Sequence, residues 1–386
     1  MTEPKRLHMS ESEANDLLRR LEAGELEATD CKLLSIILKN WLWLSGVVQR
    51  NRISIKELKK LIFGAKTEKT QKVLKSATQE KPNEKNDALN YQAARDELFH
   101  NDDTKGRVLA LEKQIAAEIE ACRDRGEACR TGVFTTGIVT KSEGRHIALF
   151  FTGRKHAGEN LGDLLNKRPQ GLPTPIQMCD ALSRNAPPGF QRLLANCLCH
   201  GRREFFKIVE EYPDECRYVL KTLREIYKND AFAKKQGLSK DDRLVFHQQN
   251  SKPIMDNFLV WLNAQLDERK IEPNSRMGGA IKYMLKHWEA LTLFLRVPGA
   301  PLDNNICERA LKTPIRHRNN SLFFKTERGA LVGDVFMSII HTCRLNGVNA
   351  FEYLRDISQH ATQVAAAPNQ WLPWNYRSEI PRCGSP

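Results

Sequence analysis

The sequence predicts an α+β protein in which helices precede and follow a small mixed sheet. Seven-residue spacings of apolar residues indicate helices within the first hundred residues. Runs rich in β-branched and aromatic residues are confined to residues 133–199. Helical patterns with charged faces return after these runs. One of the late helices is therefore free to pack back against the sheet.

The N-terminal region, residues 1–75, is expected to be α-helical. Leu34, Trp41 and Val48 recur every seven residues, which is the spacing of a helix pair or a short coiled coil. This apolar seam packs either within the chain or against a second copy, and the spacing does not choose between the two. Residues 66–90 are dominated by polar side chains, so we expect a solvated helix or a linker there.

The sheet is expected to begin with a hairpin. The sequence Lys141-Ser-Glu-Gly144 joins two β-rich runs and is a turn signal. A helix is expected over residues 156–166. The expected strands are residues 133–139, 146–151, 175–179 and 193–199.

Composition points to an intracellular protein with a polyanionic partner. The net charge of +13 favours binding to nucleic acid. Lys39 interrupts the best candidate for a membrane span, and the N-terminal residues lack the apolar core of a secretion signal. We therefore expect a cytoplasmic location and no membrane partner.

The ten cysteines include no C-x-x-C pair, so we expect reduced thiols. One local cluster, Cys197-Leu-Cys199-His200, contains residue types that bind zinc. A closed structural zinc site needs a fourth ligand, which this cluster does not supply. The cluster is therefore either part of a metal site or a set of structural side chains.

Three acidic positions have the context of a metal site. Asp102 and Asp103 follow a short apolar entry, Asp180 ends an apolar strand, and Glu308 lies near the start of a helix. Carboxylates from separate elements suit Mg²⁺, which prefers oxygen ligands. Two such ions activate a water or a 3′-hydroxyl in phosphodiester chemistry. The alternative is that Asp180 caps a helix and Glu308 pairs with Arg309 or Lys312.

Short motifs follow one another along the chain at residues 63–69, 101–104, 145–153, 154–161, 176–180, 197–205, 301–309, 346–354 and 372–375. In this order they resemble the insertion sequence 66 transposase family. The motif at residues 301–309 contains Asn-x-x-Glu308-Arg309, which is the most specific of them. The resemblance covers nearly all of residues 100–376 and part of residues 30–75.

The resemblance implies a DDE transposase with an RNase H-like, mixed-sheet catalytic core. It places the three catalytic, metal-binding carboxylates at Asp102, Asp180 and Glu308, with Asp103 as second choice for the first position. It also implies a pair of Mg²⁺ ions, for which Mn²⁺ substitutes. Asp180 and Glu308 are 128 residues apart, which leaves room for a large helical insertion between strand and helix.

The domain organisation expected from the pattern and the resemblance has five parts. These are an α-helical or coiled-coil N-terminal region at 1–75, a polar linker or deletion junction at 76–98, a catalytic core at 99–201 and 300–360, a helical insertion at 202–299, and a tail containing Pro and Trp at 361–386.

The expected partner is double-stranded DNA, both as element ends and as target. Arg309 either orients Glu308 or contacts the scissile phosphate. The other expected DNA contacts are Lys312, Arg316, Arg318, Arg202 and Arg203, whose alternative role is a solvated helix face.

The resemblance further implies a homo-oligomer on DNA, accessory proteins of the same element, and a nucleoid-associated protein of the bacterial cytoplasm. The zinc-ribbon and helix-turn-helix region usual in the family is lacking between Glu68 and Asp102. Two alternatives to an active transposase follow. One is an internally deleted, non-catalytic DNA-binding remnant that modulates an intact transposase, and the other is an RNase H-like structure-selective nuclease.

Overall fold

The computed structural model describes residues 84–125, 129–142 and 144–378, together with a few positions between 16 and 35. The chain divides into two compact units, residues 1–81 and 82–386, and the sheet belongs to the second. The predicted seam beyond Leu34 and the motif at 63–69 lie outside the described residues. In the part of the chain that is described, no helix combines the length and apolarity needed to cross a membrane.

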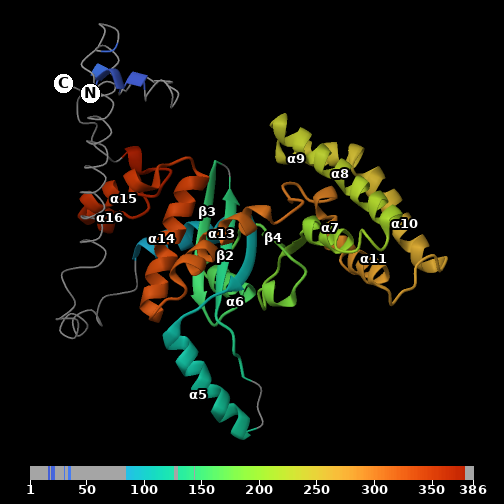
Figure 1. Cartoon of the computed structure of the whole chain (residues 1–386), viewed down its shortest axis with the longest axis horizontal. Helices are drawn as coiled ribbons and strands as arrows, with labels where there is room; N and C mark the ends of the chain where they lie inside the picture. Colours follow the sequence, from blue (N-terminus) through green and yellow to red (C-terminus); the bar gives the residue numbers. More distant parts are fainter. Residues whose placement is uncertain are drawn as a thin grey trace. The chain divides into compact units, whose positions relative to one another are not determined.

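A five-stranded mixed sheet forms the centre of the second unit (Figure 1). Its order is β3-β2-β1-β4-β5, in which β1–β2 and β2–β3 are antiparallel and β1–β4 and β4–β5 are parallel. This is the strand arrangement of an RNase H-like core, and the predicted α+β class is confirmed. The strands are β1 (Leu98–Lys105), β2 (Phe134–Ser142), β3 (Arg145–Gly153), β4 (Ile176–Cys179) and β5 (Leu193–Asn196).

Four of these strands and one helix lie where the sequence predicts them. The predicted hairpin is β2–β3, and the helix expected over 156–166 is α6 (Ala157–Leu165). β5 ends earlier than expected, because the chain enters α7 (Leu198–Phe206) after Cys197. The central strand β1 carries a polar run from His100 to Thr104 and therefore has no alternating apolar pattern to predict it.

Helices cover both faces of the sheet. Adjacent residues of β2 point to opposite faces, and Ile138 packs with α6 whereas Val139 packs with α13 (Asn305–Ser321). The first face is also covered by α4 (Glu84–Ala94), α15 (Ala350–Gln359) and α16 (Ala361–Ala366). The first half of the central strand, up to Asn101, is therefore buried.

Side chains of α14 (Glu327–Leu345) and the residue after it pair with the exposed edge of β3. Every second backbone N–H of β3 is donated to a side-chain oxygen, at 2.6–3.1 Å, in the pairs Thr152–Asp334, Phe150–Ser338, Ala148–Thr342 and His146–Asn346. Two strand residues advance about 6.6 Å and four helical residues about 6 Å, so the two repeats stay in step. We call these four side chains the polar ladder; it satisfies an edge that would otherwise be open to pairing.

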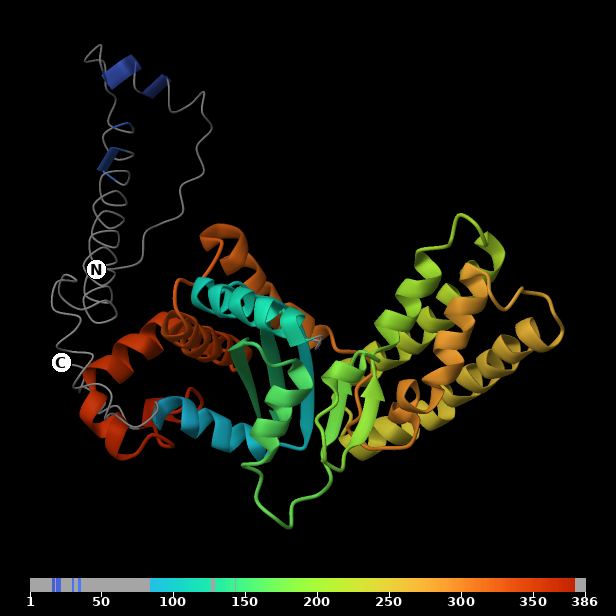
Figure 2. The ribbon, with the colours of Figure 1, turned by 90° about the horizontal axis from the view of Figure 1, so that it is seen from below.

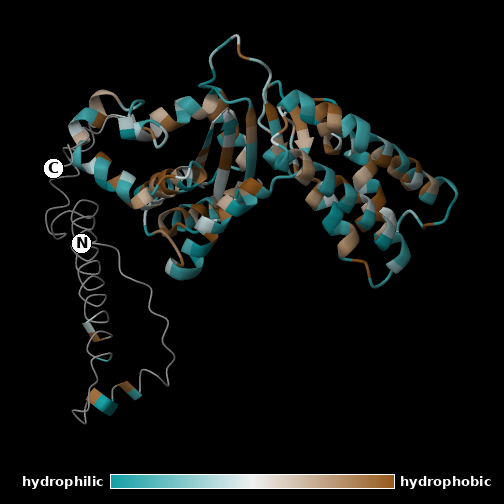
Figure 3. Cartoon of the chain, turned by 90° about the horizontal axis from the view of Figure 1, so that it is seen from above, coloured by the Kyte–Doolittle hydropathy of each residue, from teal (hydrophilic) through white to brown (hydrophobic). Residues whose placement is uncertain are grey.

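A helical lobe lies beyond β4 and β5 (Figures 1 and 2). It consists of α8 (Pro213–Lys235), α9 (Lys240–Asn250), α10 (Lys252–Asp267), α11 (Arg276–Lys286), α12 (Trp288–Leu291) and η2 (Leu293–Leu295). Its apolar core includes Met178 of β4 and Ala195 of β5. Hydrophilic and hydrophobic residues alternate along its helices, as in amphipathic segments (Figure 3).

The segment before β1 and the C-terminal tail are packed into the core. The polar composition before β1 predicts a solvated helix or a linker; the chain is helical from Glu84, and Leu89 and neighbouring alanines form a buried face of α4. In the tail, Trp371 and Tyr376 are buried with them. The remaining elements are α5 (Leu109–Arg125), η1 (Ser183–Asn185) and η3 (Tyr376–Ser378).

Candidate active site

The neighbouring carboxylates Asp102 and Asp103 point to opposite faces of β1. Asp103 faces α6: its Oδ2 lies 3.0 Å from His156 Nδ1, and its Oδ1 lies 3.3 Å from an Arg184 guanidinium nitrogen. Its side chain is only 2% exposed. Asp103 is thus engaged in an internal ion-pair network, whereas Asp102 faces α13.

Asp102 lies beside the point where α13 presses on the sheet. Its cross-strand partner is Gly137 of β2, whose carbonyl oxygen accepts a hydrogen bond from Cys307 Sγ at 3.3 Å. A Cβ on Gly137 would approach Leu311 Cδ2 to 3.0 Å. Glycine at 137 therefore allows the first turns of α13 to reach the β1–β2 surface next to Asp102.

Asp180 follows β4 directly, at the end nearest Asp102. The parallel pairing of Leu98 with Ile176 has the same sequence offset as Asp102 with Asp180, so Asp180, just beyond the end of β4, lies level with Asp102 in the middle of β1. Burial, and next the charge of Asp180, raise the pKa of Asp102 to about 7. Two carboxylates that repel each other in a buried position favour a bound cation.

An amide network supports this pair. The Asn185 side chain donates to Asp180 Oδ1, and the Asn185 carbonyl oxygen accepts from Asn101 at 2.9 Å and Gln177 at 2.6 Å. Asn101, Gln177 and Asn185 are all at most 2% exposed. The sequence prediction missed these residues; the signal that could have indicated them is a glutamine in the middle of an apolar strand, at 177.

Glu308 lies in the first turn of α13, and Asn304, the residue before that helix, fixes the start of the helix against β1. Asn304 is fully buried; its amide donates to the Asn101 carbonyl oxygen at 3.1 Å, and its Oδ1 lies 3.0 Å from His100 Nδ1. These two bonds attach the start of α13 to β1. Burial lowers the pKa of His100 to about 4, so the imidazole is neutral and donates to Asn304.

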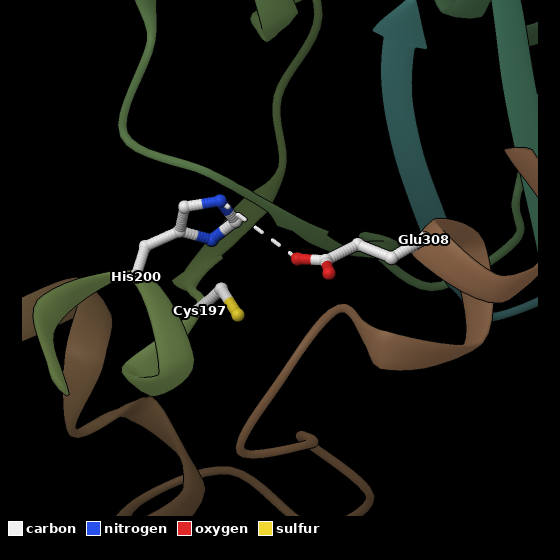
Figure 4. A group of neighbouring side chains, drawn as sticks. All are labelled: Cys197, His200 and Glu308. Atoms are coloured by element: carbon white, nitrogen blue, oxygen red, sulfur yellow. Dashed lines mark ion pairs between the residues drawn. The ribbon is translucent and has the colours of Figure 1, made fainter. Parts of the chain in front are cut away.

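The Glu308 carboxylate turns toward α7 (Figure 4). It lies 3.8 Å from His200 Nε2 and 3.9 Å from an Arg203 guanidinium nitrogen. Ligand atoms of Cys197, His200 and Glu308 lie within 4.8 Å of one another, and this is the one such group of three among the described His, Cys, Asp and Glu residues. Asp102, Asp180 and Glu308 do not form a group of this compactness.

The predicted basic residues occupy different environments. Lys312 and Arg316 are exposed on α13, whereas Arg318 donates to the Lys105 carbonyl oxygen at the end of β1. Arg309 is exposed and lines a separate cavity of about 510 Å³; in the described part of the chain, the arginine that pairs with Glu308 is Arg203.

A basic cavity adjoins α7. It has a volume of about 680 Å³, and its apolar wall includes Tyr227 of α8. Its cationic side chains are Arg202, Arg217, Lys221 and Arg224. The last three follow one another by four and three residues along α8, so they share one helix face. The cavity can accept an anionic group close to the site.

The sequence model described as "Transposase IS66 family" matches residues 70–331, more than half of the chain. The chain belongs to this family. Membership supports a transposase-related function. The family match covers Asp102, Asp180 and Glu308 as well as Cys197 and His200.

Three proteins of Sinorhizobium fredii (strain NBRC 101917 / NGR234) are similar to this family member. The uncharacterized protein y4jD is 32% identical over 192 residues, which are 48% of this chain and 36% of the relative. The uncharacterized protein y4hP is 30% identical over 47% of this chain and 35% of its own length, and y4qI is 27% identical over 48% and 34%. The chain spans about a third of the length of the curated relatives it matches.

The donor set fits the divalent metal that the family implies. Asp102 and Asp180 supply oxygen ligands from two strands, and their mutual repulsion is the arrangement that a cation relieves. Glu308 Oε1 is buried without a hydrogen-bond partner. All three groups offer the hard oxygen atoms that Mg²⁺ prefers.

Proposed function

We propose that this chain is a DNA transposase of the DDE type that cleaves the ends of an insertion sequence and joins them to target DNA. The observation that supports it best is the meeting of three elements at one corner of the sheet. Asp102 lies within β1, Asp180 directly follows the neighbouring parallel strand β4, and α13 brings Glu308 to the same face. On this proposal the three carboxylates hold two Mg²⁺ ions, or Mn²⁺ in their place.

The bound ions would supply Lewis acidity for phosphodiester cleavage and strand transfer. The chain's own residues orient the ligands. Asn185 holds the Asp180 carboxylate, and Asn304 anchors the first turn of α13 to β1. Glu308, which pairs with His200 and Arg203 in the structure, completes the set by turning its side chain toward Asp102.

DNA binding is assigned to cations that surround this corner. Lys312 and Arg316 are exposed on α13, and Arg202 and Arg203 are exposed on α7. Such side chains neutralise phosphates and set the register of the duplex. We include Arg309 as a phosphate contact, and we assign Arg318 to the support of β1 because it already binds the Lys105 carbonyl oxygen. A homo-oligomer that pairs two DNA ends, with accessory proteins, is part of the same proposal.

The test is strand cleavage and strand transfer by the full chain on DNA carrying the ends of its element, with Mg²⁺. We expect Glu308→Gln to abolish both reactions and to leave DNA binding intact. Glu327→Gln is the matched control, because Glu327 also lies in the first turn of a helix but is exposed and bonds only Gln114 among the described residues.

Full activity of the Glu308→Gln protein would contradict the assignment of the third carboxylate. DNA binding without cleavage by the wild-type chain, in Mg²⁺ and in Mn²⁺, would instead indicate the non-catalytic remnant. Cleavage that depends on DNA structure and never transfers a strand would indicate the structure-selective nuclease.

A further inference from the structure

Three side chains of different chemistry meet near the carboxylates Asp102 and Asp180. Cys197 is the residue before α7, His200 lies in the first turn of α7, and Glu308 lies in the first turn of α13. Figure 4 shows the imidazole and the carboxylate directed toward each other, with the sulfur beside them. The starts of two helices thus present sulfur, nitrogen and oxygen donors to one small volume.

Two buried atoms of these side chains lack hydrogen-bond partners in the described structure. His200 Nδ1 and Glu308 Oε1 are both buried atoms without a partner. His200 Nε2 and Glu308 Oε1 are 3.8 Å apart, which exceeds hydrogen-bonding distance. Burying a polar atom without a partner is costly, and a cation held between Nε2 and Oε1 would satisfy the Glu308 oxygen.

The donor types select the cation. Zn²⁺ takes Cys, His and carboxylate ligands at about 2.0–2.3 Å, which sets neighbouring ligand atoms roughly 3.3–3.8 Å apart. For a nitrogen–oxygen pair this spacing is about 3.3–3.5 Å. The observed 3.8 Å between His200 Nε2 and Glu308 Oε1 is slightly longer, and small side-chain rotations close the set around an ion, since all three ligand atoms lie within 4.8 Å of one another. Mg²⁺ is disfavoured because it does not take thiolate ligands.

The local charge also allows Zn²⁺. Arg203 lies 3.9 Å from Glu308 Oε2 and would repel an isolated dication. A Cys197 thiolate and the Glu308 carboxylate carry two negative charges between them and neutralise the ion. The thiol proton passes to solvent as the metal binds.

We propose that Cys197, His200 and Glu308 form a three-ligand Zn²⁺ site, and that its occupation withholds Glu308 from Asp102 and Asp180. The second part rests on the proposed function, because it makes Zn²⁺ an inhibitor of strand cleavage. Glu308 is common to both ligand sets, so the two sets compete for it.

Binding is tested with Co²⁺ as the probe, because a cobalt–thiolate bond gives a near-ultraviolet charge-transfer band. We expect the full wild-type chain to develop this band at one equivalent and to lose it when Zn²⁺ is added. Cys197→Ser should remove the band, and His200→Gln should weaken binding by roughly tenfold or more. Cys343→Ser is the control, since Cys343 is also a buried free thiol but lies at the end of α14.

Absence of the band in the wild-type chain, or its persistence in Cys197→Ser, overturns the site. If Cys197→Ser does not fold, as judged by circular dichroism, the Co²⁺ titration is repeated with His200→Gln, because His200 is partly exposed. Unchanged Co²⁺ affinity of His200→Gln then overturns it.

Inhibition is measured separately, as Mg²⁺-dependent strand cleavage at rising Zn²⁺. We expect wild-type cleavage to stop near one equivalent of Zn²⁺, and Cys197→Ser to need roughly tenfold more. Equal sensitivity of the two proteins overturns the inhibitory part and leaves the binding result standing. A chain that never cleaves DNA removes the inhibitory part together with the proposed function, while the cobalt band still decides the site.

Discussion

Asp334, the first member of the polar ladder, should make the fold less stable as pH rises. Its side chain is almost fully buried, and it accepts hydrogen bonds from the Thr152 N–H at 2.6 Å and the Thr152 hydroxyl at 2.7 Å. Burial raises the pKa of Asp334 to about 7, and the two bonds from Thr152 offset only part of that rise. In the unfolded chain an aspartate titrates near pH 3.9. The folded state therefore retains a proton that the unfolded state releases.

The direction of the change in stability with pH follows from the raised pKa of Asp334. The contribution of Asp334 to stability is complete below about pH 4, is lost as pH rises toward 7, and is constant above that. A difference of about 3 pKa units corresponds to about 4 kcal/mol over the whole range, of which about 2.5 kcal/mol falls between pH 5 and pH 8. In Asp334→Asn the amide oxygen can still accept from the Thr152 N–H, and the amide nitrogen can donate to the Thr152 hydroxyl. The asparagine side chain cannot ionise.

We expect the free energy of unfolding of Asp334→Asn, relative to wild type, to rise by about 2.5 kcal/mol from pH 5 to pH 8. Urea unfolding of both proteins at the two pH values, followed by tryptophan fluorescence, measures this difference. Asp163→Asn makes the same chemical change at an exposed position and is the control. A difference that does not change with pH would show that Asp334 is ionised in the fold, and that the bonds from Thr152 outweigh burial.

Two further predictions concern α13. Replacing Lys312 and Arg316 together by alanine should reduce the slope of log affinity against log salt by about 2, because each phosphate contact contributes about 0.9. Fluorescence anisotropy of labelled DNA across a salt series measures this slope. An unchanged slope would exclude phosphate contacts by these side chains. Gly137→Val should cost about 1–3 kcal/mol by overpacking against Leu311, which a Cβ would approach to 3.0 Å. Because the displaced helix carries Glu308, cleavage should fall even where circular dichroism shows a folded protein, and wild-type cleavage would contradict this account of the site.

The sequence predicts the fold best where one face of an element is apolar. The β2–β3 hairpin and α6 follow from alternation and helical spacing, and both are found. β1 was missed because its residues from His100 onward are polar, although it is the central strand. The polar ladder was missed for a related reason. Its members lie four residues apart along α14 and the residue after it, and a polar residue at that spacing predicts an exposed helix face unless the edge of β3 is known to lie against it.

The candidate site shows the same limit. The motif at 101–104 contains two acidic residues, and the resemblance alone left the choice between Asp102 and Asp103 open. Once β1 is known to be a strand, alternation separates them. Phe99 packs with α6, so Asp103 shares that face and Asp102 lies on the face of α13. The hydrogen bond between Asp103 and His156 joins residues 53 apart in sequence and could not be derived from local pattern.

Glu308 is the group whose surroundings the sequence could predict least. The backbone of α13 is held at both ends of its first turns, by Asn304 on β1 and by Leu311 against Gly137. Its carboxylate, by contrast, ends a flexible side chain and meets His200, more than a hundred residues earlier in the sequence. On the proposed function, and with the helix anchored, Glu308 would exchange between the Cys197–His200 pair and the Asp102–Asp180 pair by rotation of its side chain. In the proposed mechanism, Glu308 therefore moves from the Zn²⁺ ligands Cys197 and His200 to the Mg²⁺ ligands Asp102 and Asp180 without any rearrangement of the sheet.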